Sequence, residues 1–108
     1  MSSKAIRFIE YTILKTLIEE LAVRSWALCS YHPQFDTIIE LQRFDEFWKA
    51  YREIDAHGVL LFEDEDGGRL GVFVVQGNGE DVISDYAVNP DFDEAVKAAQ
   101  ASIETPRY

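Results

Sequence analysis

The first stretch of the chain repeats its apolar residues at helical spacing. Between residues 4 and 21 they recur at steps of three and four positions, as Ile6, Ile9, Ile13, Leu17 and Leu21, with Leu14 and Ile18 widening the stripe. This spacing places them on one face of an α-helix, and the face is broad enough to lie on a sheet. We therefore expect a helix over residues 4–21, with Ser2 or Ser3 as its N-cap.

Beyond this helix the pattern becomes an alternation with a period of two. Residues 23–31 alternate in this way, His32-Pro33-Gln34 interrupts them, and residues 35–41 form a second apolar stretch. Two strands of a hairpin explain this pattern, and a continuation of the first helix to Tyr31 is the alternative. The hairpin is favoured because Val23, Trp26 and Tyr31 are residue types enriched in strands, and Ser25 and Ser30 would interrupt a helical stripe.

The segment from residue 43 to residue 54 carries an aromatic stripe at helical spacing. Its members are Phe44, Phe47, Trp48, Tyr51 and Ile54. Asp45 and Glu46 fall in the first turn, where negative charge is favourable. We expect a second helix here, ended by His57-Gly58, whose stripe packs into the core.

The second half of the chain is typical of a strand meander followed by a helix. Strands are expected at residues 59–62, 69–76 and 80–88, joined by an acidic turn over residues 63–68 and a type I′ turn at Gly77-Asn78-Gly79. Asn89 and Pro90 supply the N-cap and first residue of a final helix. The order helix, hairpin, helix, three-stranded meander, helix predicts an α+β domain with its helices packed on one antiparallel sheet.

Composition fits a single domain over residues 1–108. The chain is 47% hydrophobic and 13% aromatic, which is enough for a packed core. It has no run of about 20 apolar residues that would span a bilayer, and Arg7 and Glu10 interrupt the opening segment, unlike a signal peptide. Its single cysteine, Cys29, has no partner for an internal disulfide. These features favour a cytoplasmic protein.

Charge is distributed unevenly along the chain. Residues 1–52 carry seven acidic and seven basic side chains, whereas residues 53–94 carry twelve acidic side chains and a single basic one, Arg69. The net charge of the whole chain is −10. A field of that sign attracts basic surfaces and repels nucleic acids and anionic lipids. We therefore expect a basic protein surface as the partner, and neither direct nucleic-acid binding nor membrane binding.

The motifs of cofactor and metal sites are missing. Gly77-Asn78-Gly79 joins two expected strands, whereas a phosphate loop joins a strand to a helix. The acidic segments at residues 63–66 and 89–93 lack the twelve-residue ligand spacing of a calcium loop. His32 and His57 are isolated from each other and from the cysteine, without the spacing of a transition-metal site. We expect no cofactor and no metal.

Enzymatic activity has one candidate in the sequence, a pair of aspartates. Asp81 and Asp85 would share one face of the last expected strand, and either would serve as a general base if it were buried in a cleft. Ser84 stands outside any Gly-x-Ser-x-Gly elbow. Carboxylates on an exposed sheet face are commoner than catalytic ones, so we expect a protein without enzymatic activity.

Two stretches of the chain are informative, residues 66–71 (Asp-Gly-Gly-Arg-Leu-Gly) and residues 77–86 (Gly-Asn-Gly-Glu-Asp-Val-Ile-Ser-Asp-Tyr), and only the second is distinctive. With them the chain resembles a group of small, uncharacterised bacterial proteins of plasmids, phages and other mobile elements. The resemblance implies a genomic setting in which small acidic proteins often disable host defences directed at DNA. It carries over no catalytic residues.

The acidic excess on a well-formed core indicates a role in protein–protein interaction. Spaced carboxylates can stand in for phosphates, which recur about every 3.4 Å along one DNA strand. The expected contact residues are Glu63, Asp64, Glu65, Asp66, Glu80, Asp81 and Asp85. We expect an inhibitor that mimics nucleic acid and blocks a host DNA-binding defence protein, as anti-CRISPR and antirestriction proteins do. The alternative is a structural or accessory module that forms a homodimer through a free sheet edge and exposed aromatic side chains, with Trp26, Tyr31 and Trp48 as candidates.

Overall fold

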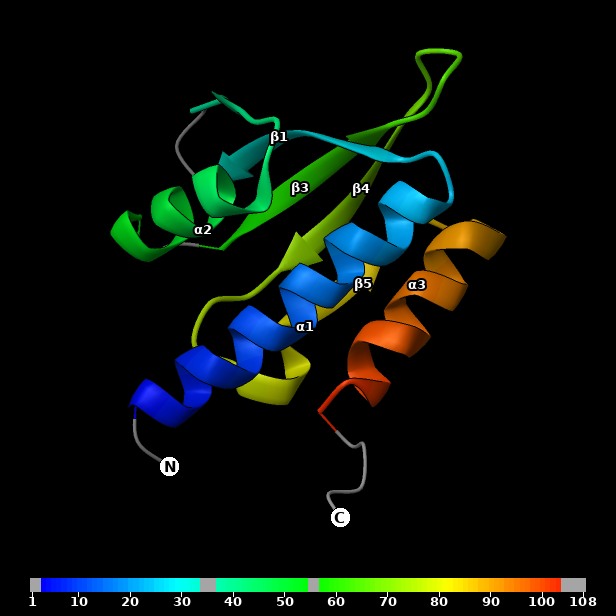
Figure 1. The fold of residues 1–108 in the computed structure, drawn as a ribbon. Coiled ribbons are helices and arrows are strands. Elements are labelled where there is room, and N and C mark those ends of the chain that lie inside the picture. Colours follow the sequence, from blue (N-terminus) through cyan, green and yellow to red (C-terminus); the bar gives the residue numbers. More distant parts are fainter. Residues whose placement is uncertain (1–2, 34–36, 55–56, 104–108) are drawn as a thin grey trace.

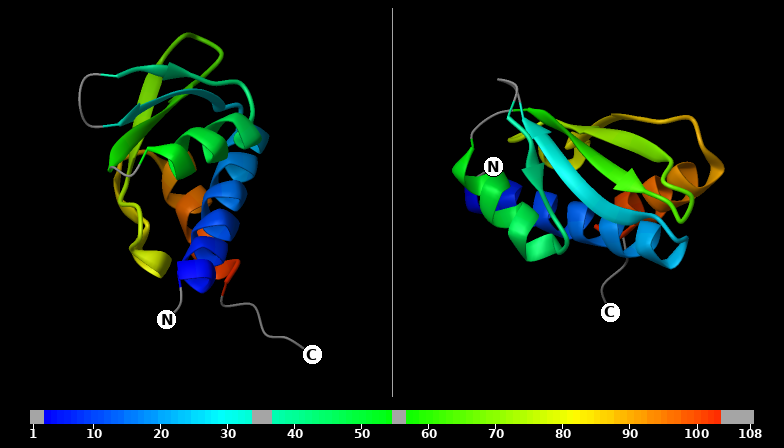
Figure 2. Two further views of the ribbon diagram at one scale, coloured as in Figure 1. Left: turned by 90° about the vertical axis from the view of Figure 1, so that its left-hand side faces the viewer. Right: turned by 90° about the horizontal axis from the view of Figure 1, so that it is seen from above.

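In the part of the chain that the structure describes, an antiparallel sheet forms one layer and three α-helices form the other (Figure 1). The computed structural model describes residues 3–33, 37–54 and 57–103. The elements in chain order are α1 (Ser3–Val23), β1 (Ala27–Pro33), β2 (Ile39–Glu40), α2 (Phe44–Glu53), β3 (Gly58–Glu63), β4 (Arg69–Val74), the 3-10 helix η1 (Gly79–Asp81), β5 (Ile83–Tyr86) and α3 (Pro90–Ala101). The strand order is β2-β1-β3-β4-β5, and the three helices lie on the same face of the sheet (Figure 2). The predicted α+β class, with helices packed on one antiparallel sheet, is confirmed.

α1 ends two residues beyond its predicted boundary, in a hydrogen-bonded turn. The backbone N–H of Trp26 donates to the carbonyl oxygen of Leu21 (2.8 Å), and Ser25 between them has a φ of 67°. This is the pattern of a Schellman C-cap, which stops a helix by a left-handed residue. The strand predicted over residues 23–31 therefore begins only at Ala27. The alternative, in which the helix continues through this segment, is wrong.

β2 is shorter than the strand predicted over residues 35–41. Only Ile39 and Glu40 pair with β1, and residues 35 and 36 lie outside the described part of the chain. α2 then follows close to its predicted position. At its start the carboxylate of Glu46 accepts the backbone N–H of Arg43 (3.0 Å), which satisfies a donor that a helix N-terminus leaves free.

Gly58 opens β3, although it was predicted to end α2. A Cβ at this position would lie 2.7 Å from the carbonyl oxygen of His32 and 2.7 Å from the ring of Tyr31. Only glycine allows β1 and β3 to approach so closely here.

The connection between β4 and β5 is not the predicted type I′ turn. That turn needs positive φ at both Asn78 and Gly79, but Asn78 has a φ of −90°, while Gly77 and Gly79 have φ values of 86° and 62°. The chain forms η1 instead, so β4 ends and β5 begins inside their predicted bounds. Asp81 consequently lies in η1 and does not share a strand face with Asp85.

Asn89 caps α3 as the sequence predicted. Its Oδ1 accepts the backbone N–H groups of Asp91 (2.8 Å) and Phe92 (3.4 Å), and Pro90 occupies the first helical position. This satisfies two of the donors left free at the helix start.

The hydrophobic core fills the space between the sheet and the helices. Five members of the predicted stripe of α1 lie in it, from Ile13 to Leu21, together with Leu60 and Phe62 of β3, while Ile9 packs against it. The aromatic stripe of α2 contributes Phe47 and Tyr51, which are fully buried, and Phe47 packs edge-on against Tyr31 with ring centroids 5.3 Å apart. None of the helices in the described part of the chain combines the length and hydrophobicity needed to cross a membrane.

Candidate functional site

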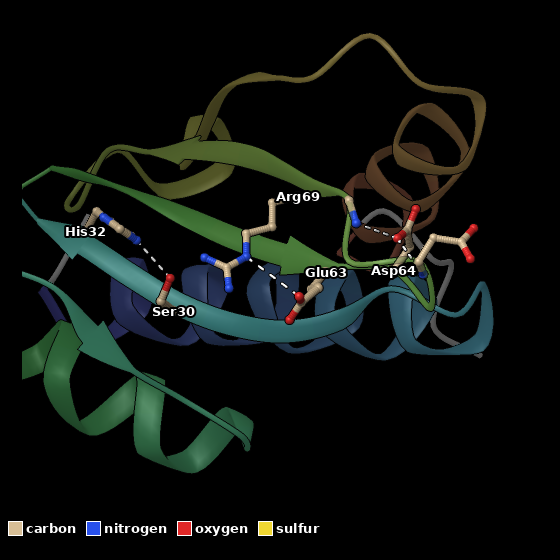
Figure 3. A network of polar contacts seen from close by, with 7 residues as sticks. Ser30, His32, Glu63, Asp64 and Arg69 are labelled. Atoms are coloured by element: carbon tan, nitrogen blue, oxygen red, sulfur yellow. Dashed lines mark hydrogen bonds and ion pairs between the residues drawn. The ribbon is translucent and has the colours of Figure 1, made fainter.

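Four of the seven predicted contact residues lie at one end of the sheet, Glu63 as the last residue of β3 and residues 64–66 in the projecting turn between β3 and β4 (Figure 1). Asp64 shapes this turn, because its Oδ1 accepts two backbone N–H groups of the turn (2.7 and 3.0 Å). Glu63 pairs with Arg69 of β4 (3.7 Å; Figure 3). Glu65 and Asp66 are exposed and form no ion pair with any residue in the described ranges.

The first turn of α3 lies at the same end of the molecule as the β3–β4 turn (Figures 1 and 2). This turn carries Asp91 and Asp93, and Glu94 follows them in the helix. We call residues 63–66 together with these three residues the acidic end. The sequence pattern identified residues 89–93 only as an acidic segment at the start of a helix. Their position at the same end as the β3–β4 turn follows from the packing of α3 alongside α1, which the pattern did not specify (Figure 1).

The other predicted contact residues lie elsewhere. Glu80 and Asp81 belong to η1, which follows the opposite end of β4. β4 has six residues, and at about 3.3 Å per residue it separates them from the acidic end by about 20 Å. Asp85, on β5, lies between the two groups and pairs with Phe73 of β4. The seven residues therefore do not form one contiguous patch.

Asp93 is held in place by two partners within the acidic end. It accepts a hydrogen bond from the Tyr86 hydroxyl (3.0 Å) and pairs with Lys97 one helical turn later (3.1 Å). The hydrogen bonds from Lys97 and from Tyr86 lower the pKa of the Asp93 carboxyl, and those same contacts raise the pKa values of Tyr86 and Lys97. Asp93 therefore stays negatively charged to a lower pH than an isolated aspartate.

The face of the sheet away from the helices carries a polar cluster (Figure 3). The Ser30 hydroxyl and Nε2 of His32 lie 2.8 Å apart on β1, near the Glu63–Arg69 pair. A serine–histidine pair needs a third group to orient the imidazole ring before it acts as a nucleophile and base. Within the described residues no hydrogen bond to Nδ1 of His32 is found. The cluster is an arrangement of polar contacts without the geometry of a catalytic triad.

A buried carboxylate on α1 is the feature that the sequence analysis missed. Glu10 is only 2% exposed. Its Oε1 accepts a hydrogen bond from the Tyr51 hydroxyl (2.6 Å) and its Oε2 accepts the backbone N–H of Gly79 (2.8 Å). Burial and then the hydrogen bond to Glu10 raise the pKa of Tyr51 far above its ordinary value, and burial raises the pKa of Tyr31 to about 12. The sequence did indicate this burial, because Glu10 follows Ile6 by four positions and therefore falls on the apolar face of the helix.

Two of the aromatic residues predicted for a dimer interface are core residues. Trp26 is 7% exposed and donates its indole N–H to Asp91 (3.1 Å), and Tyr31 is fully buried. Trp48 is half-buried and stacks on Tyr51, with ring centroids 5.3 Å apart. The prediction that Trp26 and Tyr31 are exposed is wrong.

The two aspartates considered for general-base catalysis are exposed and stand on different elements, Asp81 on η1 and Asp85 on β5. Across the described residues no group of three or more His, Cys, Asp or Glu side chains is placed to hold a metal ion.

Comparison with protein-family models, with curated proteins and with solved structures finds no match for this chain. The resemblance to proteins of mobile elements therefore stays a prediction.

Proposed function

We propose that the protein is a non-catalytic binding protein whose acidic end docks on a basic surface of another protein. The main support is that Glu65, Asp66 and Glu94 are exposed and lack ion pairs with the described residues. The turn and the helix that carry them are fixed by backbone N–H groups that donate to the side-chain oxygens of Asp64 and Asn89. Carboxylates held in this way lose little conformational freedom when a partner's Lys or Arg side chains neutralise them.

In its specific form the proposal is that the partner's basic surface is one that normally binds nucleic acid. A protein that contacts phosphates presents clustered Lys and Arg side chains, and a rigid group of carboxylates offers these the same charge. This form places the protein in the cytoplasm, among small factors of mobile elements that block DNA-directed defence. It rests on the charge distribution and on the resemblance of residues 66–71 and 77–86.

The test uses the full chain as bait in a bacterial lysate, at low and at physiological ionic strength. We expect recovery of a nucleic-acid-binding protein, release of that protein by salt, and inhibition of its DNA binding by the bait. Glu65→Gln/Asp66→Asn removes two charges from the acidic end and should weaken recovery. Glu80→Gln/Asp81→Asn removes two charges from η1 and serves as the matched control. Equal weakening by both pairs, or binding that does not respond to salt, would contradict the proposal.

A homodimeric accessory module is the second candidate, and one observation favours it. β5 is the last strand of the sheet, with four residues, so its outer edge has backbone groups available for pairing. Light scattering across a range of protein concentrations separates the two candidates. A stable dimer at every concentration supports the accessory module, and a monomer throughout removes it.

A further inference from the structure

A groove between α1 and α2 differs in character from the rest of this acidic molecule. It has a volume of about 510 Å³, which is within the range typical of small-molecule sites. Tyr11 and Trp48 form an aromatic wall, and Arg7, Lys49 and Arg52 bring three positive charges to it. Asp45, which pairs with Arg43 (3.6 Å), and Glu53 also line the groove. The aromatic lining thus keeps an excess of one positive charge in a chain whose net charge is −10.

The three cations of the groove have no anionic partner within the described residues. The ion pairs found there involve Arg24, Arg43, Arg69 and Lys97. The side chains of Arg7, Lys49 and Arg52 form no hydrogen bond or ion pair with the described part of the chain. This is unexpected on average, since acidic residues outnumber basic ones by twenty to ten. Arginine binds phosphate and carboxylate groups through two parallel N–H donors.

The aromatic wall is held in position by packing between the two helices. The Tyr11 ring meets the Trp48 ring edge-on with centroids 5.2 Å apart, and Trp48 stacks on Phe44 at 6.0 Å. Trp48 is only half-buried, so part of its surface faces the groove. A planar ring bound there would gain stacking energy on a wall that is already fixed.

A smaller cavity of about 190 Å³ adjoins the groove and shares Arg7 and Arg52 with it. Gln76 and the buried Glu10 line this cavity. The Oε1 atom of Gln76 is buried and has no hydrogen-bond partner in the described residues. Leaving such an atom without a hydrogen bond is unfavourable, and a ligand N–H that donated to it would remove that cost. The cavity therefore offers a hydrogen-bond acceptor next to the two arginines.

We infer that this groove binds a small organic anion that combines a planar ring, an N–H donor and one phosphate or carboxylate group. A nucleoside monophosphate has this chemistry. The anionic group would bind between Arg7 and Arg52. The ring would then stack on Trp48, or the N–H donor of the ligand would donate to the side-chain oxygen of Gln76. A polymeric nucleic acid is not the ligand, because it would also meet Glu80 and Asp81 and the remaining excess of carboxylates. A small anion is screened from distant charges, since the Debye length is about 8 Å at physiological salt.

NMR titration of the full-length protein with AMP tests the inference. We expect shifts at the Trp48 indole N–H and at the side-chain amide of Gln76, with a dissociation constant of about 1 mM or tighter. The Trp26 indole, which is bonded to Asp91, should not shift. Arg52→Gln should weaken binding about tenfold. Arg69→Gln, which removes the same charge from the open face of the sheet, should leave binding unchanged.

Two half-ligands make the result specific. Adenosine lacks the anionic group and inorganic phosphate lacks the ring, so each should bind at least about tenfold more weakly than AMP. The inference is overturned if AMP produces no shifts at the groove, if phosphate alone binds as tightly as AMP, or if Arg52→Gln and Arg69→Gln have equal effects. Because Arg52 and Arg69 are exposed, the two variants should fold, and the spectrum of each shows whether it does.

Discussion

The buried carboxylate of Glu10 joins three segments that are distant in the chain. It stands on α1 and accepts hydrogen bonds from Tyr51 on α2 and from Gly79 in η1, 41 and 69 residues away. Removing a carboxylate from water is costly unless hydrogen bonds replace those to solvent. Here both oxygens accept one. The network therefore fixes α2 and η1 relative to α1. Its carboxylate also gives the backbone N–H of Gly79 an acceptor.

Glu10→Ala should lower the free energy of unfolding by about 3 kcal/mol, because it leaves two buried donors unsatisfied at about 1–3 kcal/mol each. Glu10→Gln is the matched control. Its amide oxygen can accept from Gly79 and its NH2 group can donate to Tyr51, so we expect a loss of about 1 kcal/mol. Equilibrium unfolding in urea measures both values. An equal loss in the two variants would show that the charge of Glu10, rather than its hydrogen bonds, stabilises the fold.

At the scale of single elements, the sequence predicts a boundary correctly when the contacts that set this boundary lie between residues close together in the chain. Asn89 and Pro90 define the start of α3 through contacts within three residues, and that start was predicted correctly. The segment around Gly79 was predicted wrongly, because the contact that decides its conformation comes from Glu10, far away in the chain. The end of α1 was also missed, since Ser25 occupies a left-handed position that glycine usually fills.

Ser25→Gly should stabilise the protein by about 0.5–1 kcal/mol. Ser25 has a φ of 67°, a conformation that costs a residue with a Cβ about 1–2 kcal/mol. Glycine avoids this cost. Part of the gain is lost, because glycine also increases the conformational entropy of the unfolded chain. Ser25→Ala keeps the Cβ and should change stability little. Thermal unfolding compares the two variants. A destabilised glycine variant would mean that the serine side chain makes a compensating contact.

The whole molecule separates its charge into regions that the linear sequence does not show. Residues 53–94 look like one acidic block in the sequence, but β4 divides them between the acidic end and η1. The first 52 residues look neutral, yet three of their cations converge on the groove between α1 and α2. Both regroupings depend on the direction of the β3–β4 hairpin and the packing of helices, so the chain order alone could not predict them.

This distribution predicts how salt and acid change thermal stability. Carboxylates without cations repel one another, so moderate salt should raise the melting temperature. Asp66→Asn should raise it by about 1–3 °C at low salt, equivalent to a few tenths of a kcal/mol. Glu20→Gln, which removes the partner of Arg24 at 2.9 Å, should lower it slightly, and salt should reduce both differences.

Mild acidification from neutral pH should likewise raise the melting temperature as unpaired carboxylates lose their charge, until Asp93 protonates. The pKa of Asp93 is lowered in the folded state. Its contribution is therefore fully present above the pKa of the unfolded chain and is lost as the pH falls through the folded value. Asp93→Asn cannot protonate, so the melting temperature of this variant should fall less at acidic pH than that of the parent protein. Calorimetry over a series of pH values measures the difference. If salt instead lowers the melting temperature of the parent protein, ion pairs outweigh repulsion, and the acidic end is not the free anionic surface on which the proposed docking depends.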